Sequence, residues 1–348
     1  VLVIERRKTM KKYNVCVLGA TGMVGKEMMK VLEERNFPVN KFLPLASGRT
    51  AGSKVTFQGK EYTVEEAKPE SFEGIEIGLF SAGGNVSAAL APEAAKRKCV
   101  VIDNTSHFRM DPEVPLIVPE VNGHAIKKHK GIIANPNCST AQMVLALKPI
   151  YDAVGIERIV VSTYQSVSGW GKEAVEELMT QTKALLADPK ANVEVKCIFK
   201  RIAFNVVPQI DQFTDNGYTK EELKMVNETK KIFEDDSIKV TATTVRVPVV
   251  IGHSESVNIT TKKKISASEA RKLMGGFADI KIMDDPAKGI YPTVLDCAGK
   301  NETLVGRVRE DISQERGLEM WIVADNLRRG AALNAVLIAE RMIKDGLI

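Results

Sequence analysis

One cysteine of this chain stands in a setting suited to covalent catalysis. Cys138 lies in the polar segment N-P-N-C-S-T, between an apolar run typical of a strand and a pattern typical of a helix. A thiol at a helix start feels the field of the helix N-terminus, which favours the nucleophilic thiolate. We therefore predict that Cys138 is a nucleophile. The alternative, a small buried apolar residue, fits Cys16, Cys99 and Cys297 better, and Cys197 lies in a charged-apolar run without any catalytic cue.

A catalytic thiol needs a partner that exchanges protons near neutral pH, and imidazole is suited to this task. The chain has four histidines. His124 and His129 lie in the polar stretch NGHAIKKHK, which is typical of a solvated face, and His107 is ambiguous. His253 follows a glycine in a β-rich run, where a structural, hydrogen-bonded histidine is the alternative reading. The residues alone favour the structural reading, so His253 stands here only as a candidate acid/base.

A glycine-rich loop suggests a dinucleotide site. GATGMVG, from Gly19 to Gly25, follows the apolar run Tyr13–Leu18 and precedes a helical stripe of apolar residues. Glycines permit a tight turn and let backbone N–H groups approach a pyrophosphate at a helix N-terminus. The alternative is a glycine-rich turn that only packs a helix on a strand.

The end of the next expected strand indicates which dinucleotide would bind. NAD sites usually place an acidic residue there for the ribose 2′-hydroxyl. Here the segment ASGRTAG offers Ser47, Arg49 and Thr50 and no carboxylate. A guanidinium pairs bidentately with phosphate, so the segment favours the 2′-phosphate of NADP over NAD. A solvated loop arginine is the alternative.

The elements that position these residues fall into two groups, and 348 residues suit two domains at roughly 150 residues each. Short apolar strands alternate with helices as far as residue 154, which predicts an α/β domain with a parallel sheet. After residue 157 the pattern becomes α+β. Its β-rich runs are Arg158–Ser168, Ile238–Val250 and Ser254–Thr261, and we expect the last two to pair as antiparallel neighbours. Helical patterns cover 173–186, 220–233, 267–274 and 328–343.

Spacing adds two details to the second domain. Arg246 and His253 are seven residues apart, so on an unbroken strand their side chains would face opposite ways. A bend at Pro248 or Gly252 would be needed to bring both to one pocket. On the helix 220–233, Thr219 and Glu222 form a plausible capping box, and Glu221 and Lys224 share a face, where a surface ion pair is the alternative to a substrate role.

Composition excludes several classes of function. The net charge of +5 and the 5% aromatic content are no signature of nucleic-acid binding. Five cysteines without C-x-x-C spacing predict no disulfide framework and no metal site, and favour a cytoplasmic location. No apolar run approaches the ~20 residues of a membrane span, and the opening VLVIERRKTM is too polar for a signal peptide. Met10 is a possible alternative start.

Seven segments occur together in an order that resembles the aspartate-β-semialdehyde dehydrogenase family, bacterial type. They are GATGMVG, ASGRTAG, VIDNTSHFRM, NPNCST, STYQSVSG, EELK and RVPVVIGHSES, and they span nearly the whole chain from about residue 11. The resemblance implies an NADP-dependent, phosphorylating aldehyde dehydrogenase that reduces L-aspartyl-4-phosphate. The product, aspartate semialdehyde, would serve lysine (diaminopimelate), threonine and methionine biosynthesis. Thr50 replaces a serine that is commoner in the family, which retains the hydroxyl.

The resemblance also implies roles for individual residues. Cys138 would be the nucleophile, His253 the acid/base and Gln165 an orienting residue. The substrate would be bound by Arg246 at its carboxylate, Glu221 at its amino group, Arg109 and Lys224 at its phosphate, and Asn137. The cofactor-binding residues would be Gly19, Thr21, Gly22, Met23, Val24, Gly25, Ser47, Arg49, Thr50, Ser81, Ala82, Gly83, Ser168, Gly169 and Asn326.

The resemblance further implies a Rossmann-like NADP-binding domain at 11–138, completed by a C-terminal helix at 327–348. A catalytic and dimerisation domain with a mostly antiparallel sheet would occupy 139–326. The chain would form a homodimer, or a tetramer of paired dimers. The nearest alternative enzyme is N-acetyl-γ-glutamyl-phosphate reductase, whose cysteine usually follows Pro-Gly rather than Asn137. A non-catalytic NADPH-binding regulator would lack the thiol or the histidine, and both are present.

Overall fold

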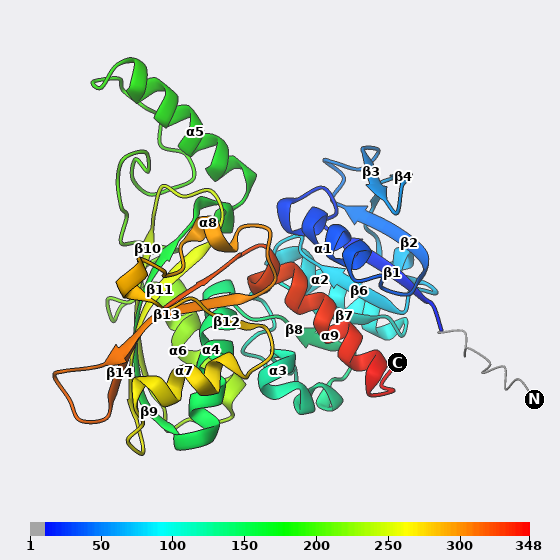
Figure 1. Ribbon diagram of the computed structural model, residues 1–348. Coiled ribbons are helices and arrows are strands. Elements are labelled where there is room, and N and C mark those ends of the chain that lie inside the picture. The colour runs from blue at the N-terminus through cyan, green and yellow to red at the C-terminus, as the bar shows by residue number, and fades with distance from the viewer. Residues whose placement is uncertain (1–10) are drawn as a thin grey trace, which may run out of the picture.

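The computed structural model describes residues 11–348. Two sheets lie beside each other, each with its own helices, and helix α5 (Lys172–Ala187) extends away from the body (Figure 1). The opening segment VLVIERRKTM, with the possible start at Met10, lies outside the described residues.

The first sheet is parallel throughout, as the alternation of strands and helices predicted. Its strand order is β5-β2-β1-β6-β7-β8, and every neighbouring pair is parallel. The chain leaves β1 toward β2 on one side and later returns to place β6 on the other, so a topological switch point lies between β1 and β6. The strands are β1 (Tyr13–Leu18), β2 (Val39–Ala46), β5 (Glu65–Glu66), β6 (Ile77–Phe80), β7 (Val100–Asp103) and β8 (Ile132–Ala134).

Helices cover both faces of this sheet. Helix α1 (Met23–Glu34) and the C-terminal helix α9 (Leu333–Lys344) bury Val31 and Val336 in one core with Val15 of β1. On the other face, α2 (Gly84–Lys96) packs Ala91 into the core that contains Leu18. A small hairpin, β3 (Lys54–Phe57) and β4 (Lys60–Thr63), stands beside the sheet. The predicted final helix differs at its start, because Arg328–Ala332 forms a π-helical turn before α9.

The second sheet is mixed and mostly antiparallel, as predicted. Its order is β10-β9-β11-β14-β13-β12, with parallel pairing only between β9 and β10 and between β12 and β13. The strands are β9 (Ile156–Gln165), β10 (Lys239–Arg246), β11 (His253–Thr261), β12 (Ile280–Ile282), β13 (Thr303–Glu310) and β14 (Gly317–Ala324).

One expected pairing in this sheet is wrong. The runs 238–250 and 254–261 are not neighbours, because β9 lies between β10 and β11 and bonds to both. Closeness in sequence suggested a hairpin, but the six residues between Arg246 and His253 cross over β9. The long run 158–168 also ends earlier than expected, at Gln165, and continues as a 3₁₀ turn from Val167 to Trp170.

Helices α4 (Cys138–Val154), α6 (Lys220–Phe233) and α7 (Ala267–Gly275) pack against one face of the second sheet. The opposite face holds a groove of about 550 Å³, lined in part by Tyr164, Tyr291 and Trp321. The remaining short helices are α3 (Pro119–Asn122), α8 (Val294–Cys297) and the 3₁₀ segments Pro69–Phe72, Gly123–Lys128 and Pro286–Lys288.

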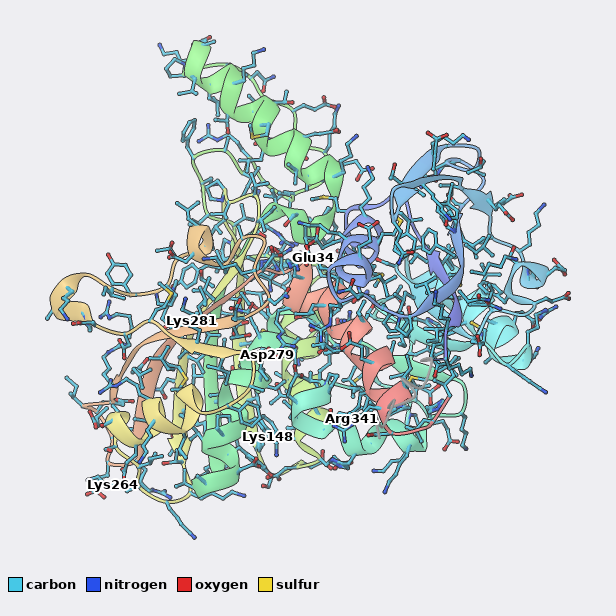
Figure 2. The ribbon with its side chains drawn as sticks, turned by 45° about the vertical axis from the view of Figure 1, so that its right-hand side comes forward. Glu34, Lys148, Lys264, Asp279, Lys281 and Arg341 are labelled. Atoms are coloured by element: carbon cyan, nitrogen blue, oxygen red, sulfur yellow. The ribbon has the colours of Figure 1, made fainter. Side chains whose placement is uncertain are left out.

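Two buried arginines join the halves of the molecule at the π-helical turn. Arg328 donates to Glu27 and Glu34 of α1 and also to Asn301, which precedes β13. Arg329 donates to Glu120 of α3 at 2.7 Å and to Asp279, before β12, at 3.1 Å (Glu34 and Asp279 are labelled in Figure 2). Ion pairs therefore connect the turn to helices beside the first sheet and to a segment of the second sheet.

Candidate active site

Cys138 is the first residue of α4, four residues after β8 ends, so the predicted strand-to-helix position is confirmed. Asn137 caps the helix: its side-chain oxygen accepts from the N–H groups of Ser139 and Thr140 at 3.0 and 3.2 Å. Gly330 of the π-helical turn packs on the cysteine so closely that a methyl group there would lie 2.4 Å from its Cβ. Cys138 therefore stands at a capped helix end between the two halves of the molecule.

Three neighbouring strands of the second sheet bring together three of the predicted site residues. Arg246 at the end of β10 pairs with Gln165 at the end of β9, and His253 at the start of β11 pairs with the same glutamine. Residues in register on adjacent strands point to the same face of a sheet. On one unbroken strand the seven-residue spacing would put Arg246 and His253 on opposite faces. They share a face here because they lie on different strands, each paired with Gln165.

The neighbours of His253 fix its tautomer. Its Nδ1 accepts the backbone N–H of Ser166 at 3.1 Å, so in the neutral ring Nε2 carries the hydrogen. Nε2 has no partner and is buried, and a methyl group on Gly169 would lie 3.3 Å from it. Burial, assisted by the Arg246 charge, lowers the pKa of His253 to about 3. The ring is therefore neutral, with an Nε2–H that is free to donate a hydrogen bond.

The protonation state of Cys138 differs from the expectation that a helix start favours the thiolate. Burial raises the pKa of Cys138 to about 12, and the Glu221 carboxylate adds to the rise, against the opposing charges of Arg246 and Arg109. Desolvation of the charged form thus outweighs the field of the helix N-terminus. The Cys138 thiol and the His253 imidazole are therefore both neutral near pH 7.

Helix α6 brings a buried charge cluster to the thiol. The predicted capping box of Thr219 and Glu222 is present, which leaves Glu221 free to face inward. The Glu221 carboxylate accepts from Asn137 Nδ2 at 2.7 Å, from Gln165 Nε2 at 3.3 Å and from Lys224 Nζ at 3.0 Å. Burial alone would raise the pKa of Glu221, but Lys224, Asn137 and Arg246 together hold it at about 2. Glu221 is therefore a buried anion rather than half of a surface pair.

These residues line one cavity of about 230 Å³. From the predicted set, the lining contains Cys138, Gln165, Arg109, Asn137, Glu221, Lys224, Arg246, Ser168, Gly169, Asn326 and Val24. His253 is fully buried and lies just outside the lining, behind Gly169. Asn326 binds the neighbouring loops: its Oδ1 accepts from Ser166 Oγ at 3.0 Å and from the Gly252 N–H at 2.8 Å.

The remaining predicted cofactor residues gather at the carboxyl end of the first sheet, outside that cavity. Gly19 has a φ of +91°, and a methyl group there would lie 2.6 Å from the carbonyl oxygen of Ser81, so the loops after β1 and β6 touch at the switch point. Gly22 caps α1 without a side-chain bond, and the first turn of α1 has no acidic residue. This end, formed by Gly19, Thr21, Gly22, Met23, Gly25, Ser81, Ala82 and Gly83, suits a pyrophosphate.

The segment expected to meet the 2′-phosphate is open to solvent. Ser47, Arg49 and Thr50 are exposed, and Thr50 Oγ1 lies 3.2 Å from Thr21 Oγ1, which links it to the glycine-rich loop. Arg49 forms no ion pair within residues 11–348, so its guanidinium remains free to bind an anion. The segment is therefore accessible to a ligand beside the glycine-rich loop.

Four residues that contact this machinery were not predicted. Glu228 on α6 bonds to Arg109 and to the backbone of Asn137, and Ser139 Oγ accepts from Gln165 Nε2 at 2.9 Å. Ser166 holds His253, and Glu255, two residues beyond His253 on β11, is a fully buried carboxyl whose pKa burial raises well above its usual range. Only Glu228 had a sequence signal, because it lies one turn beyond Lys224 on the inward face of α6.

Fold and cavity together define a two-domain oxidoreductase of the semialdehyde dehydrogenase class. Residues 14–129 match the family model described as "Semialdehyde dehydrogenase, NAD binding domain". Residues 147–329 match "Semialdehyde dehydrogenase, dimerisation domain". Within residues 11–348, no helix is long and apolar enough to cross a membrane, and no three metal-ligating side chains gather into a cluster.

The chain belongs to the aspartate-semialdehyde dehydrogenase family. It is 55% identical to the Aquifex aeolicus enzyme over 339 residues, which is 97% of this chain and 99% of the relative. It is 52% identical to the Bacillus subtilis enzyme, over 96% and 99% of the two chains. A Vibrio cholerae aspartate semialdehyde dehydrogenase II complexed with ASA superposes with a TM-score of 0.93 at 51% identity, over 96% and 99% of the chains. A Candida albicans enzyme with NADP gives 0.77 at 25%, over 97% and 100%.

Proposed function

We propose that this protein reduces L-aspartyl-4-phosphate to L-aspartate 4-semialdehyde and phosphate with NADPH, in the biosynthesis of lysine, threonine and methionine. One observation carries the proposal: a thiol at a helix start shares one cavity with a buried carboxylate, two arginines and a lysine. The substrate has the complementary groups, namely an ammonium, a carboxylate and an acyl phosphate. The family relationship supports the same reaction.

The covalent step belongs to Cys138. Its sulfur attacks the acyl carbon, the bond to the phosphate oxygen breaks, and phosphate leaves to give a thioester. The thiol proton would depart with the phosphate, because Nε2 of His253 already carries a hydrogen and its Nδ1 accepts the Ser166 N–H at 3.1 Å. NADPH, when bound, would supply the hydride that reduces the acyl carbon. Nε2–H of His253 would donate a hydrogen bond to the carbonyl-derived oxygen, and Gln165 would help to orient the same group. The carbon–sulfur bond would then break, the aldehyde would leave, and the Cys138 sulfur would take up one proton from water.

Substrate recognition would use the charges of the cavity. Arg246 has one nitrogen held by the Ser166 carbonyl at 2.6 Å, which orients its guanidinium, and we assign it to the α-carboxylate. Glu221 would take the ammonium, and Arg109 and Lys224 the phosphate. Asn137 keeps Glu221 in place through its 2.7 Å bond. An ion pair that remains buried needs both partners, so each group also selects against substrates that lack its counter-charge.

The cofactor would be NADP. The glycine-rich loop and the uncapped start of α1 would hold the pyrophosphate, and Ser47, Arg49 and Thr50 the 2′-phosphate. Ser168, Gly169 and Asn326 would lie beside the nicotinamide at the cavity. The Candida albicans relative with NADP supports this choice, as does the absence of a carboxylate from the segment 46–52.

The assembly would be a homodimer, or a tetramer of paired dimers, built through the open face of the second sheet. Tyr164, Tyr291 and Trp321 line the groove there, and the matching family model is described as a dimerisation domain. We assign 11–138 with 327–348 to the cofactor domain and 139–326 to the catalytic domain. The five free cysteines accord with a cytoplasmic location.

The alternative substrate is N-acetyl-γ-glutamyl phosphate, which has a neutral amide where aspartyl phosphate has an ammonium. That amide would leave the Glu221 anion unpaired, and a buried unpaired charge costs several kcal/mol, so rejection on the order of 10³-fold is expected. A non-catalytic regulator is disfavoured because the thiol and the imidazole are both in place.

The deciding experiment follows NADPH formation at its absorbance band with aspartate semialdehyde, phosphate and NADP. The wild type should be active with this aldehyde and inactive with N-acetylglutamate semialdehyde, and Glu221→Gln should narrow that gap in kcat/KM. Turnover of both aldehydes by the wild type, or an unchanged ratio in the variant, would refute the role of Glu221. No turnover of either would refute the proposed function.

A further inference from the structure

Four charged residues occupy one face of α6 at helical spacing. Glu221, Lys224, Glu228 and Lys231 lie at positions i, i+3, i+7 and i+10, which align along a helix. The first two line the cavity, and the last two do not. Glu228 and Lys231 therefore lie behind the substrate groups, on the same face.

Glu228 bonds to two segments, the loop that carries Arg109 and the turn that leads into α4. Its Oε1 accepts from Arg109 Nη1 at 3.1 Å, and its Oε2 accepts from the backbone N–H of Asn137 at 2.6 Å. Glu228 is 1% exposed and Arg109 is 7% exposed. One carboxylate thus contacts the assigned phosphate ligand and the residue directly before the nucleophile.

Lys231 holds the backbone of the loop that carries Arg109. Its Nζ donates to the carbonyl oxygens of Arg109, Asp111 and Val114 at 2.7, 2.7 and 2.9 Å. Arg109 Nη2 donates to the Asn104 carbonyl at 3.0 Å, whereas its Nε is buried without a partner. The loop and two nitrogens of the guanidinium, Nη1 and Nη2, are therefore held in place, and Arg109 is one of the residues that line the cavity.

We propose that Glu228 is a positioning residue that sets the Arg109 guanidinium for the phosphate and, through Asn137, the start of the helix that presents the thiol. This inference rests on the proposed function, since it assigns the phosphate to Arg109. Glu228 itself does not touch substrate. A carboxylate with a purely structural role would contribute only to folding. Its loss would not raise the KM for phosphate while leaving the KM values for aspartate semialdehyde and NADP unchanged.

The test variant is Glu228→Gln, which keeps the size of the side chain. The amide oxygen can still accept from the Asn137 N–H, but the amide nitrogen cannot accept from Arg109. A charge-assisted bond accounts for roughly 10- to 150-fold in binding, so the KM for phosphate in the oxidative direction should rise by about that factor. The KM for NADP should stay within about twofold of wild type.

Glu177→Gln is the matched control. Glu177 is also a buried carboxylate, 7% exposed on α5, and it accepts the backbone N–H groups of Lys196 and Cys197. It lies outside the cavity lining, so all three KM values should remain those of the wild type.

A double variant separates positioning from independent binding. If Glu228 acts through Arg109, then Arg109→Gln with Glu228→Gln should have the same phosphate KM as Arg109→Gln alone. Should Glu228→Gln fail to fold, Lys231→Met releases the same loop from its far side, and it should raise the phosphate KM with little change in the KM for NADP.

The outcomes are distinct. No turnover by the wild-type enzyme rejects the proposed function, and the inference with it. Wild-type turnover combined with an unchanged phosphate KM in Glu228→Gln, or with additive effects in the double variant, overturns the positioning role alone. An equal rise in the KM of phosphate and of NADP also overturns it.

Discussion

The two halves of the site are built by different means. The expected cofactor half is a local motif: residues 21–24 and 47–52 are exposed or partly exposed, and a contact between the Thr21 and Thr50 hydroxyls links the two segments. The catalytic half is assembled from distant segments by buried side chains. Asn137 reaches Glu221 across 84 positions, and Ser166 reaches Asn326 across 160.

The difference shows that backbone groups would bind the ligand in one half, whereas buried side chains would do so in the other. Backbone N–H groups and glycine turns can bind a pyrophosphate with little help from neighbouring side chains. A nucleophile, a proton donor and a carboxylate ligand need fixed mutual positions, which here come from strand register and from bonds between buried groups. Substitutions in the catalytic half should therefore lower kcat, and those in the cofactor half should alter cofactor KM.

The largest effect is expected from Cys138→Ala. Without the sulfur no thioester forms, so turnover should be abolished. NADP binding should persist, because the glycine-rich loop does not depend on the thiol. Turnover by absorbance and NADP affinity by fluorescence titration test both parts, and substantial residual activity would contradict the assignment.

His253→Asn should lower kcat by about 10²- to 10⁴-fold, the usual contribution of acid–base help. The asparagine can retain the bond to the Ser166 N–H but cannot exchange a proton. Steady-state kinetics with both substrates provide the test. Loss of affinity with an unchanged kcat would instead assign His253 to binding.

Two glycine variants compare the halves directly. A methyl group on Gly330 would lie 2.4 Å from Cys138 Cβ, and one on Gly25 would lie 2.1 Å from the Gly19 carbonyl oxygen. Gly330→Ala should lower kcat by roughly 10²-fold by displacing the thiol. Gly25→Ala should raise the NADP KM more than it lowers kcat. Identical kinetic changes in the two variants would break the distinction between the halves.

Arg49→Ala should raise the KM for NADP by about 10- to 150-fold, because a charge-assisted bond to the 2′-phosphate is lost. The KM for NAD, which lacks that phosphate, should change little. Kinetics with both cofactors measure the difference. Equal changes for the two would refute the assignment of Arg49.

The smallest effect concerns pH and needs no substitution. Because burial raises the pKa of Cys138 to about 12, the thiolate fraction without ligands should grow about tenfold for each pH unit up to 10. Iodoacetamide labelling at Cys138, followed by mass spectrometry, should show this rise. A plateau near pH 7 would mean that the helix N-terminus outweighs burial after all.

The sequence predicted the first sheet well because its strands are short apolar runs that alternate with helices. It predicted the second sheet less well, because the sequence of a β-rich run does not show which other strand it will pair with. The segments 238–250 and 254–261 read as a hairpin, although β9 separates them, and the runs that form β13 and β14 were not identified. Pairing between strands far apart in sequence is decided by packing, which a single sequence does not display.

For the site, the sequence indicated candidate residues better than it indicated how deeply each would be buried and what it would contact. Glu221 was set apart by the capping box that occupied Glu222, and the structure places it inside the cavity. The environment of the thiol was misjudged, because burial depends on Gly330 and on the depth of the cavity rather than on local sequence. Ser166 acts through a contact 87 positions away, so spacing could not reveal it, whereas helical spacing from Lys224 could have indicated Glu228 but not its partner Asn137.

The position of α9 links the site to the order of synthesis. Helix α9 leaves the ribosome, which adds about 5–20 residues per second, long after strand β1, with which it shares a core. Until residues 328–344 emerge, α9 does not cover its face of the first sheet and Gly330 is missing from beside Cys138. A nascent chain that ends before residue 328 would therefore carry the thiol without this wall of its pocket.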